Sequence, residues 1–318
     1  MMNEDPLVSI GVPVYNEERY LSFTLESLLA QDYRNLELII SDNASTDRTR
    51  EICQEYVNRD GRVRYYRTET NVGAVKNFNS TFLHARGKYF MWVGAHDTWH
   101  SSFISRALSL IEADPRIVLV YSRTMLIDPD GHSLSITPDE MDTRGLSALH
   151  RYLKFIWTIH WCNMIHGLIR SEVIRGTGMF RRILGSDILL LAELSLIGEF
   201  AQIRDTLFYR RENRPEPSQK NVEEWKERYL MTMEGSYNAE HTKASLPELF
   251  RELRTAILKV VANSELTYRQ KLHAYLHTMV CFSFRYGVSF PGDVLLLTGR
   301  QTTNALKKLY SRVVQGAA

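Results

Sequence analysis

The stretch Val8-Ser9-Ile10-Gly11-Val12-Pro13-Val14-Tyr15-Asn16 decides the fold, together with Leu38-Ile39-Ile40-Ser41-Asp42-Asn43, which follows one helix later. Each stretch is an apolar run of strand length that ends in small, polar or turn-forming residues. Buried parallel strands show this pattern where they deliver side chains to a ligand at their carboxyl ends. The pair therefore predicts a nucleotide pocket at one edge of a sheet.

Residues 7–123 alternate apolar, strand-like runs with helical segments. We expect strands near residues 7–14, 36–42, 63–67, 89–94 and 117–121. The first helix should span residues 18–29, and Ser45 or Thr46 could cap the second, with Asp47 favourable in its first turn. This alternation requires crossover connections. It predicts an α/β fold in which helices cover both faces of a mostly parallel sheet.

The composition excludes several classes of protein. Of the 318 residues, 44% are hydrophobic and 24% are charged, so the chain can bury a real core and is not disordered. A net charge of +2 is too small to indicate nucleic-acid binding. The three cysteines, Cys53, Cys162 and Cys281, are widely spaced and include no Cys-x-x-Cys pair. They predict neither a disulfide framework nor a zinc site, which fits a reducing cytosol.

The sequence also bears on membranes. Residues 1–6 lack the basic and then apolar profile of a signal peptide, and no run approaches the roughly 20 apolar residues of a membrane span. We therefore expect a cytoplasmic protein, either soluble or peripheral at the inner face of the membrane.

Beyond a strong turn at Asp128-Pro129-Asp130-Gly131 the strand signals become sparse. Residues 214–218 have the composition of a linker, and helical spacing follows over residues 222–238, 246–262, 266–284 and 303–314. We expect a first domain over residues 1–215, with a nucleotide half over about 1–125 and an acceptor half over about 126–215. Residues 216–318 should form a helical C-terminal region.

Two motifs resemble those of the family 2 glycosyltransferases, which have the GT-A fold. In that family the first strand ends in Pro-x-Tyr-Asn-Glu, and here the sequence is Pro13-Val14-Tyr15-Asn16-Glu17. The second strand ends in an Asp followed by Ser-Thr-Asp, which matches Asp42-Asn43-Ala44-Ser45-Thr46-Asp47. The resemblance covers about residues 7–212. It implies a GT-A fold, which is Rossmann-like, with a helical C-terminal extension. It also implies a transferase that uses a nucleotide-diphospho-sugar and inverts the configuration at the anomeric carbon.

The resemblance assigns the nucleotide to the ends of the first two strands. Asp42 could read the base, because a carboxylate accepts a hydrogen bond from the ring N–H of uracil, thymine or guanine, where cytosine has a bare acceptor. Tyr15 could stack on the base, which is worth about 1–3 kcal/mol in other base-binding sites. Pro13 and Glu17 complete this part of the predicted site. In the alternative, Asp42 and Asn43 only form a turn, and Tyr15 is a half-buried core aromatic.

The segment Asn71-Val72-Gly73-Ala74-Val75-Lys76-Asn77 resembles the family's Asn-x-Gly segment and the helix that follows it. The glycine allows the backbone to approach a ligand, and Lys76 could bring positive charge near a diphosphate. Asn71 and Lys76 therefore join the predicted nucleotide site. The alternative is a glycine-containing turn and helix cap, with Lys76 solvated.

The segment Met91-Trp92-Val93-Gly94-Ala95-His96-Asp97-Thr98 stands where the family carries an acidic cluster for a metal ion. Gly94 and His96 occupy positions where carboxylates are usual, and Asp97 remains to bind Mn²⁺ or Mg²⁺, with the diphosphate and water as further ligands. His96 could be a ligand that favours Mn²⁺, or it could point away from the ion. The resemblance also puts Ala95 and His96 beside the nucleotide.

Two later segments resemble the family's acceptor side. Asp187, in Gly185-Ser186-Asp187, is the candidate general base that deprotonates the acceptor hydroxyl. It could instead begin a helix, where the dipole favours a carboxylate. Arg210 and Arg211 resemble the segment after the last strand and could offset charge on the diphosphate, or form a solvated basic edge. We interpret residues 160–166 as the lining of the acceptor pocket or as core.

The resemblance implies a hexosyltransferase that moves a sugar from a UDP- or dTDP-linked donor to a hydroxyl of a carbohydrate or lipid-linked acceptor, with Mn²⁺ or Mg²⁺. It leaves the sugar, the acceptor and the linkage open. Two other interpretations are a sugar nucleotidyltransferase and a non-catalytic nucleotide-sugar binding module. The C-terminal helices could form a structural cap or a homodimer interface, or contact an anionic membrane through basic residues near the end of the chain. Those residues are Arg300, Lys307, Lys308 and Arg312.

Overall fold

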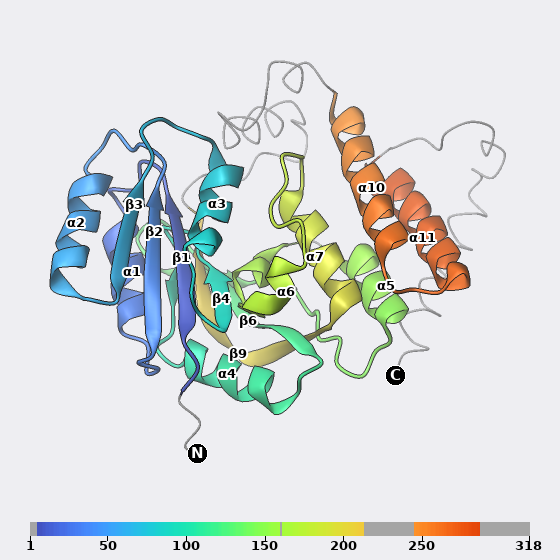
Figure 1. The fold of residues 1–318 in the computed structure, drawn as a ribbon, viewed down its shortest axis with the longest axis horizontal. Helices are drawn as coiled ribbons and strands as arrows, with labels where there is room; N and C mark the ends of the chain where they lie inside the picture. Colours follow the sequence, from blue (N-terminus) through green and yellow to red (C-terminus); the bar gives the residue numbers. More distant parts are fainter. Residues whose placement is uncertain (1–4, 160, 213–244, 287–318) are drawn as a thin grey trace.

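The computed structural model describes residues 5–159, 161–212 and 245–286 (Figure 1). One sheet runs through the protein in the order β3-β2-β1-β4-β8-β6-β9-β5, and β7 pairs with β6 outside this path. Helices pack on both faces of the sheet. The α/β prediction is confirmed.

The first half of the sheet is parallel. β1 (Val8–Val14) lies between β2 (Leu36–Asp42) and β4 (Tyr89–Trp92), and β3 (Val63–Arg67) extends the sheet beyond β2. The register pairs Val14 with Asp42 and Asp42 with Arg67. Three strands therefore end level with one another, and the loops that leave them lie side by side.

Alternate residues of the strands face two cores. The aliphatic residues of β1 pack with α1 (Leu21–Leu29), α2 (Thr49–Arg59) and α4 (Phe103–Ala113). On the other face, Phe90 and Trp92 of β4 pack with Phe82 of α3 (Ala74–Leu83). This period of two is what a pleated strand imposes when both of its faces are buried.

The second half of the sheet mixes directions. Its longest ladder joins β6 (Ile117–Ile127) and β9 (Glu199–Arg211) in parallel. The remaining elements are shorter: β5 (Thr98–Trp99), β7 (Ser133–Ile136), α5 (Ala148–Thr158), the 3-10 helix η1 (Asn163–His166), β8 (Leu168–Arg170), α6 (Ser171–Arg175) and α7 (Ser186–Ile197). Among these short strands, β5, β7 and β8 pair antiparallel to their neighbours.

Sequence patterns predicted β2 and β3 at the observed residues but missed β8 and β9. β8 is only three residues long, and bulges interrupt the β6–β9 ladder, so neither strand shows a regular alternation. The expectation that Arg210 and Arg211 follow the last strand is therefore wrong, because both lie inside β9.

The second helix begins later than predicted. It starts at Thr49 and not near Ser45 or Thr46, because residues 43–48 form a loop that bonds to the loop after β1. Asp47 is the residue that serves the helix start, since its Oδ1 accepts a hydrogen bond from the Thr49 N–H at 2.9 Å.

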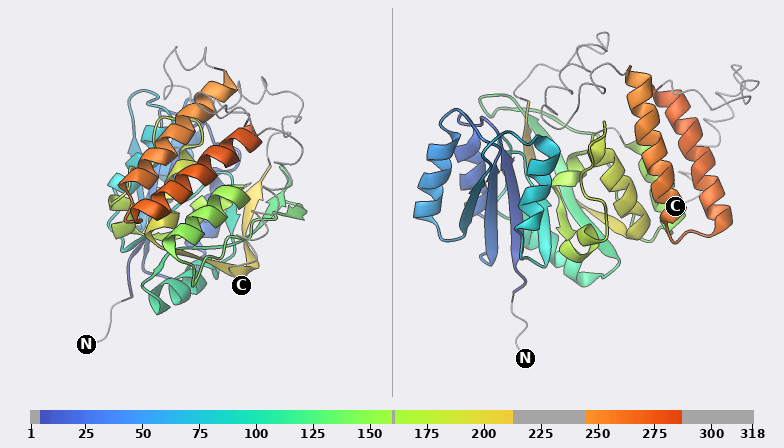
Figure 2. Two further views of the ribbon diagram at one scale, coloured as in Figure 1. Left: turned by 90° about the vertical axis from the view of Figure 1, so that its right-hand side faces the viewer. Right: turned by 45° about the horizontal axis from the view of Figure 1, so that its top comes forward.

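Two C-terminal helices, α10 (Leu246–Asn263) and α11 (Tyr268–Tyr286), pack beside α7 and α5 (Figures 1 and 2). Leu253 and Ile257 of α10 are fully buried in the same core as α5 and α7. This packing is what a structural cap requires. Membrane contact and dimerisation stay predictions. The linker over 214–218, the helices over 222–238 and 303–314, and the basic residues Arg300, Lys307, Lys308 and Arg312 lie outside the described residues.

The part of the chain that the structure describes contains no helix that is both long enough and apolar enough to span a bilayer.

Candidate active site

The loops after β1 and β2 are joined by hydrogen bonds. The backbone N–H of Asn16 donates to Ser45 Oγ at 3.0 Å, and the N–H of Thr46 donates to Asn16 Oδ1 at 2.8 Å. Asn16 and Ala44 both have left-handed backbones, with φ of 55° and 61°. Non-glycine residues rarely adopt this conformation, and it concentrates at functional sites. The two loops thus form one rigid edge.

The loop after β3 joins the same edge through asparagines. Asn43 Nδ2 donates to Asn71 Oδ1 at 2.7 Å, and the N–H of Val72 donates to Asn43 Oδ1 at 2.8 Å. Gly73, at the start of α3, has a φ of 85°, which favours glycine. Asn71 therefore fixes the approach to α3. Its contact with a nucleotide stays a prediction.

Asp42 is enclosed at the end of β2, with 0% of its surface exposed. Its Oδ1 accepts a hydrogen bond from the Ser45 N–H at 2.8 Å. Its Oδ2 accepts from Tyr65 Oη at 2.7 Å and from Arg67 Nε at 2.9 Å. What the structure shows is a carboxylate that orients Arg67 and the β2 loop, and direct reading of a base by Asp42 stays a prediction.

Tyr15 and Pro13 differ in exposure. Tyr15 is 44% exposed, so its ring is not a core aromatic and has a face that a base could use. Pro13 is buried within β1, where it shapes the strand end below Tyr15. Stacking of a base on Tyr15 stays a prediction.

Lys76 is exposed on α3. Within the described residues, no carboxylate forms an ion pair with its ammonium group. Its charge is therefore available to an anion, although the position fits the solvated alternative equally well.

His96 lies between two carboxylates. Its Nδ1 is 3.2 Å from Glu17 Oε1, and its Nε2 is 4.0 Å from Asp97 Oδ1. Burial alone would lower the pKa of His96, but the charges of Asp97 and Glu17 and the hydrogen bond with Glu17 raise it to about 9. An imidazolium has no lone pair to give a metal ion. The structure therefore pairs His96 with two carboxylates, and its role as a metal ligand stays a prediction.

Asp97 is buried in the turn after β4, and its Oδ1 accepts a hydrogen bond from the Arg211 N–H at 2.8 Å. A Cβ added to Gly94 would approach Asp97 Oδ2 to 2.5 Å. The absence of a side chain at Gly94 therefore leaves room for the Asp97 carboxylate, in addition to removing the carboxylate that the family usually has at this position. No three His, Cys, Asp or Glu side chains of the described residues are grouped to hold a metal ion. Asp97 supplies one carboxylate, and a hard divalent ion would take its other ligands from a diphosphate and water.

Two predicted residues have structural surroundings. The guanidinium of Arg211 donates to the carbonyls of His96, Asp128 and Pro129, at 3.0, 3.1 and 2.9 Å. We therefore no longer expect Arg211 to reach a diphosphate. Ala95 is buried in a core, so only its backbone remains to meet a nucleotide.

Arg210 points to the acceptor half. Its Nη1 donates to Asn163 Oδ1 at 3.1 Å, and its guanidinium carbon lies 5.0 Å from the centre of the Trp161 ring. Its charge opposes protonation of His96, so the two cations share one region. The role of Arg210 as a charge near the diphosphate or acceptor stays a prediction.

Asp187 begins α7 after Gly185, which has a φ of 71°. Burial, together with the charge of the nearby Asp187, raises the pKa of the Cys162 thiol well above its usual value. A Cβ on Gly185 would come within 2.8 Å of Leu253 in α10. The C-terminal helix α10 therefore packs against the turn that precedes Asp187. Asp187 also lies in the first turn of α7, where the helix dipole favours a carboxylate. Its role as a base stays a prediction.

Sequence reasoning missed Arg67 and Asp139, and it included Asn163 only as part of residues 160–166. Arg67 is the last residue of β3 and forms an ion pair with Asp42, the last residue of β2. The predicted strand bounds, which end at these two residues, could have indicated that they are neighbours. Asp139 gave no signal, because it lies in a loop with no motif, and no pattern paired it with Asn163 of the short 3-10 helix. Only the fold brings these two together, at 2.9 Å.

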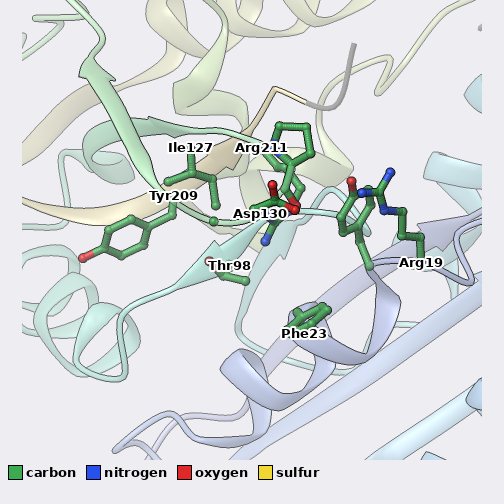
Figure 3. A pocket seen from close by; sticks show the side chains of 10 residues that line it. Arg19, Phe23, Thr98, Ile127, Asp130, Tyr209 and Arg211 are labelled. Carbon is green, nitrogen blue, oxygen red and sulfur yellow. Dashed lines mark hydrogen bonds between the residues drawn. The ribbon is translucent and has the colours of Figure 1, made fainter.

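A cavity of about 630 Å³ lies beside Arg211, which is one of its lining residues (Figure 3). Arg19, Phe23 and Tyr209 are among the residues that line it. Of the residues predicted for the donor or acceptor, only Arg211 lines this cavity. The cavity is therefore separate from the predicted nucleotide edge.

The fold and the joined loops at this edge are those of the GT-A class of proteins. Residues 9–157 match the model of glycosyl transferase family 2, and the chain carries a domain of this family. An uncharacterized glycosyltransferase of Rickettsia prowazekii is 31% identical over 177 residues, which are 55% of this chain and 54% of the relative. The chain thus spans about half the length of that curated relative.

Solved structures show the same fold over nearly the whole chain. S. aureus TarS in complex with UDP-GlcNAc is 19% identical, with a TM-score of 0.64 over 96% of this chain and 81% of that one. A mannosyltransferase of Pyrobaculum calidifontis in complex with GDP-Man and Mn²⁺ is 17% identical, with a TM-score of 0.51 over 99% and 84%. At these identities the likeness establishes the GT-A fold alone.

Proposed function

We propose that the protein is an inverting glycosyltransferase that moves a sugar from a UDP- or dTDP-linked donor to a hydroxyl of a carbohydrate or lipid-linked acceptor. The observation that carries this proposal is the edge of the family 2 domain at which three loops are joined, with Glu17 of the first loop 3.2 Å from His96, the neighbour of Asp97. The UDP-GlcNAc bound to TarS, which has the same fold, supports a uridine-linked donor.

In the proposed complex the donor lies along the ends of β1, β2 and β3. Tyr15 stacks on the base, and Asp42 contributes to base recognition, directly or through Arg67, which it holds. Lys76 offers charge to the diphosphate, because it is exposed at the start of α3.

The proposed reaction is a single displacement. Asp187 takes the proton of the acceptor hydroxyl as that oxygen bonds to the anomeric carbon. The bond from this carbon to the diphosphate breaks at the same time, and the nucleoside diphosphate leaves with the electron pair. Attack from the opposite face inverts the configuration. Arg210 offsets charge on the leaving side.

We also propose that the donor binds together with Mn²⁺ or Mg²⁺. Asp97 would hold the ion with one carboxylate, which the Arg211 N–H fixes in place. When bound, a divalent ion offsets the charge of a leaving diphosphate. The Mn²⁺ in the Pyrobaculum enzyme, which has the same fold, supports this part of the proposal.

One observation favours a second candidate, a non-catalytic module that binds a nucleotide-sugar. The described residues supply a single carboxylate at the predicted metal position, where the family usually has more. A sugar nucleotidyltransferase is less well supported, because Gly11-Val12-Pro13-Val14-Tyr15 is not a glycine-rich phosphate loop with Arg and Lys.

Release of UDP from UDP-GlcNAc and other UDP- and dTDP-sugars, without an acceptor, tests these candidates. We expect slow release that Mn²⁺ increases. Binding of UDP without any release would favour the non-catalytic module. Failure to bind any nucleoside diphosphate would overturn both.

The proposed location is the reducing cytoplasm, with the C-terminal helices as the part that would contact the inner face of a membrane. Cys53, Cys162 and Cys281 are all free thiols, which suits that compartment.

A further inference from the structure

Arg210 is held from behind by a short chain of buried polar side chains. Its Nη1 donates to Asn163 Oδ1 at 3.1 Å, and Asn163 Nδ2 donates in turn to Asp139 Oδ2 at 2.9 Å. Asn163 is 3% exposed and Asp139 is 9% exposed, so water cannot easily replace either bond. The chain joins β9, η1 and the loop after β7.

We propose that Asp139 and Asn163 are positioning residues that fix the Arg210 guanidinium toward the leaving diphosphate. This inference rests on the proposed function, because it assigns a task within the same reaction.

The chemistry of the three groups allows a single arrangement. An arginine only donates hydrogen bonds, and an ionised carboxylate only accepts them. The Asn163 amide has one end of each kind, so its oxygen must face Arg210 and its nitrogen must face Asp139. Thr137 Oγ1, at 3.3 Å from Asn163 Nδ2, accepts from the same end. Asp139 therefore determines which atom Arg210 meets.

The other sides of the guanidinium are also confined. Its carbon lies 5.0 Å from the centre of the Trp161 ring, and its Nη2 lies 3.5 Å from Glu212 Oε1. A long, flexible arginine loses entropy when it binds an anion, and a side chain held beforehand loses less. Preorganised charge of this kind is what stabilises a leaving diphosphate.

Asp139 is itself built into the fold as a charged group. Burial raises its pKa to about 6, although hydrogen bonds from Asn163, the Trp161 backbone and Thr137 act in the opposite direction. At neutral pH the carboxylate is ionised, as the amide orientation requires.

A swap of the two side chains tests the chain. Asp139→Asn removes the acceptor that orients Asn163, and Asn163→Asp brings two carboxylates into contact. The double variant Asp139→Asn, Asn163→Asp restores the chain, because the new amide can donate to the new carboxylate, which can accept from Arg210. We would measure kcat and KM for UDP-GlcNAc hydrolysis with Mn²⁺, and UDP affinity by calorimetry.

We expect each single variant to lower kcat by about tenfold or more, the scale of one lost charge-assisted contact. The double variant should recover to within about threefold of wild type, while UDP affinity changes less than kcat. A merely structural role would not lower kcat in the folded single variants while UDP affinity stays nearly unchanged. A folded double variant that is as slow as the slower single variant would overturn the positioning role.

The outcomes separate the two proposals. A wild-type protein that releases no UDP overturns the proposed function and this role with it. An active wild type without rescue overturns only the positioning role. If a single variant fails to fold, the comparison is between the double variant and wild type. A kcat of the double variant close to that of wild type would support the positioning role, and a much lower kcat would oppose it.

Discussion

The two halves of the candidate site are held together differently. In the donor half, loops that follow adjacent strands bond to one another through backbone groups and short side chains, as between Asn16 and Ser45. In the acceptor half, side chains from distant segments meet directly, as Arg210, Asn163 and Asp139 do. The first arrangement gives a preformed edge that can bind a nucleotide. The second gives a cluster of charged and polar side chains whose positions should determine the rate of sugar transfer. Donor-half variants should therefore change affinity for the nucleotide, and acceptor-half variants should change turnover.

The largest effect is expected at Asp187. Asp187→Asn should lower kcat by about 10²-fold or more, the scale of general-base catalysis, and leave UDP affinity unchanged. Steady-state hydrolysis and calorimetry measure both. Glu193→Gln, on the same helix and paired with Arg181 at 2.8 Å, controls for loss of an acidic charge. Normal turnover in folded Asp187→Asn would mean that another residue is the base.

The next effect concerns pH and stability at Asp139. Because burial raises the pKa of Asp139 in the folded protein to about 6, above the ordinary value of 3.8, the folded state binds more protons than the unfolded state between these values. Stability from this group is therefore full at low pH and is lost as pH rises through 6. From pH 4 to pH 7 the unfolding free energy of wild type should fall by about 2 kcal/mol relative to Asp139→Asn. Urea unfolding of both proteins at each pH measures this, and parallel curves would contradict the assignment.

In the donor half, Asp42→Ala should act on both binding and stability. It leaves Tyr65 Oη and Arg67 Nε without their acceptor, which costs about 1–3 kcal/mol of unfolding free energy. UDP affinity should fall by about tenfold or more, while kcat at saturating donor changes little. Asp60→Ala, which breaks an ion pair with Arg62 before β3, is the matched control. Unchanged UDP affinity would remove Asp42 from recognition.

The smallest effect is expected at Lys76. Its charge is exposed, so Lys76→Met should weaken UDP binding by less than about tenfold, in line with the 0–1 kcal/mol of exposed ion pairs. The loss should shrink as salt increases. Titrations of UDP at two ionic strengths test this, and a loss far above tenfold would indicate that Lys76 closes over the diphosphate.

The same contrast explains what sequence could predict. Strand ends and their loops are neighbours in sequence, so the motifs around Tyr15 and Asp42 predicted the donor edge and the fold. Arg211 also matched a motif, but its guanidinium bonds to backbone carbonyls, which no pattern reports. Asp139 and Asn163 meet only because β7, η1 and β9 fold together, and two of these segments are too short to give a periodic signal.

The central claim is that the joined edge after β1, β2 and β3 binds a uridine-type diphosphate with a divalent ion at Asp97. Calorimetric titration of wild type and Asp97→Ala with UDP, CDP and GDP, each with and without Mn²⁺, tests it most directly. We predict that UDP binds more tightly than CDP and GDP, and that Mn²⁺ increases UDP affinity in wild type but not in Asp97→Ala. Absence of nucleoside diphosphate binding, or the same gain from Mn²⁺ in both proteins, would contradict the claim.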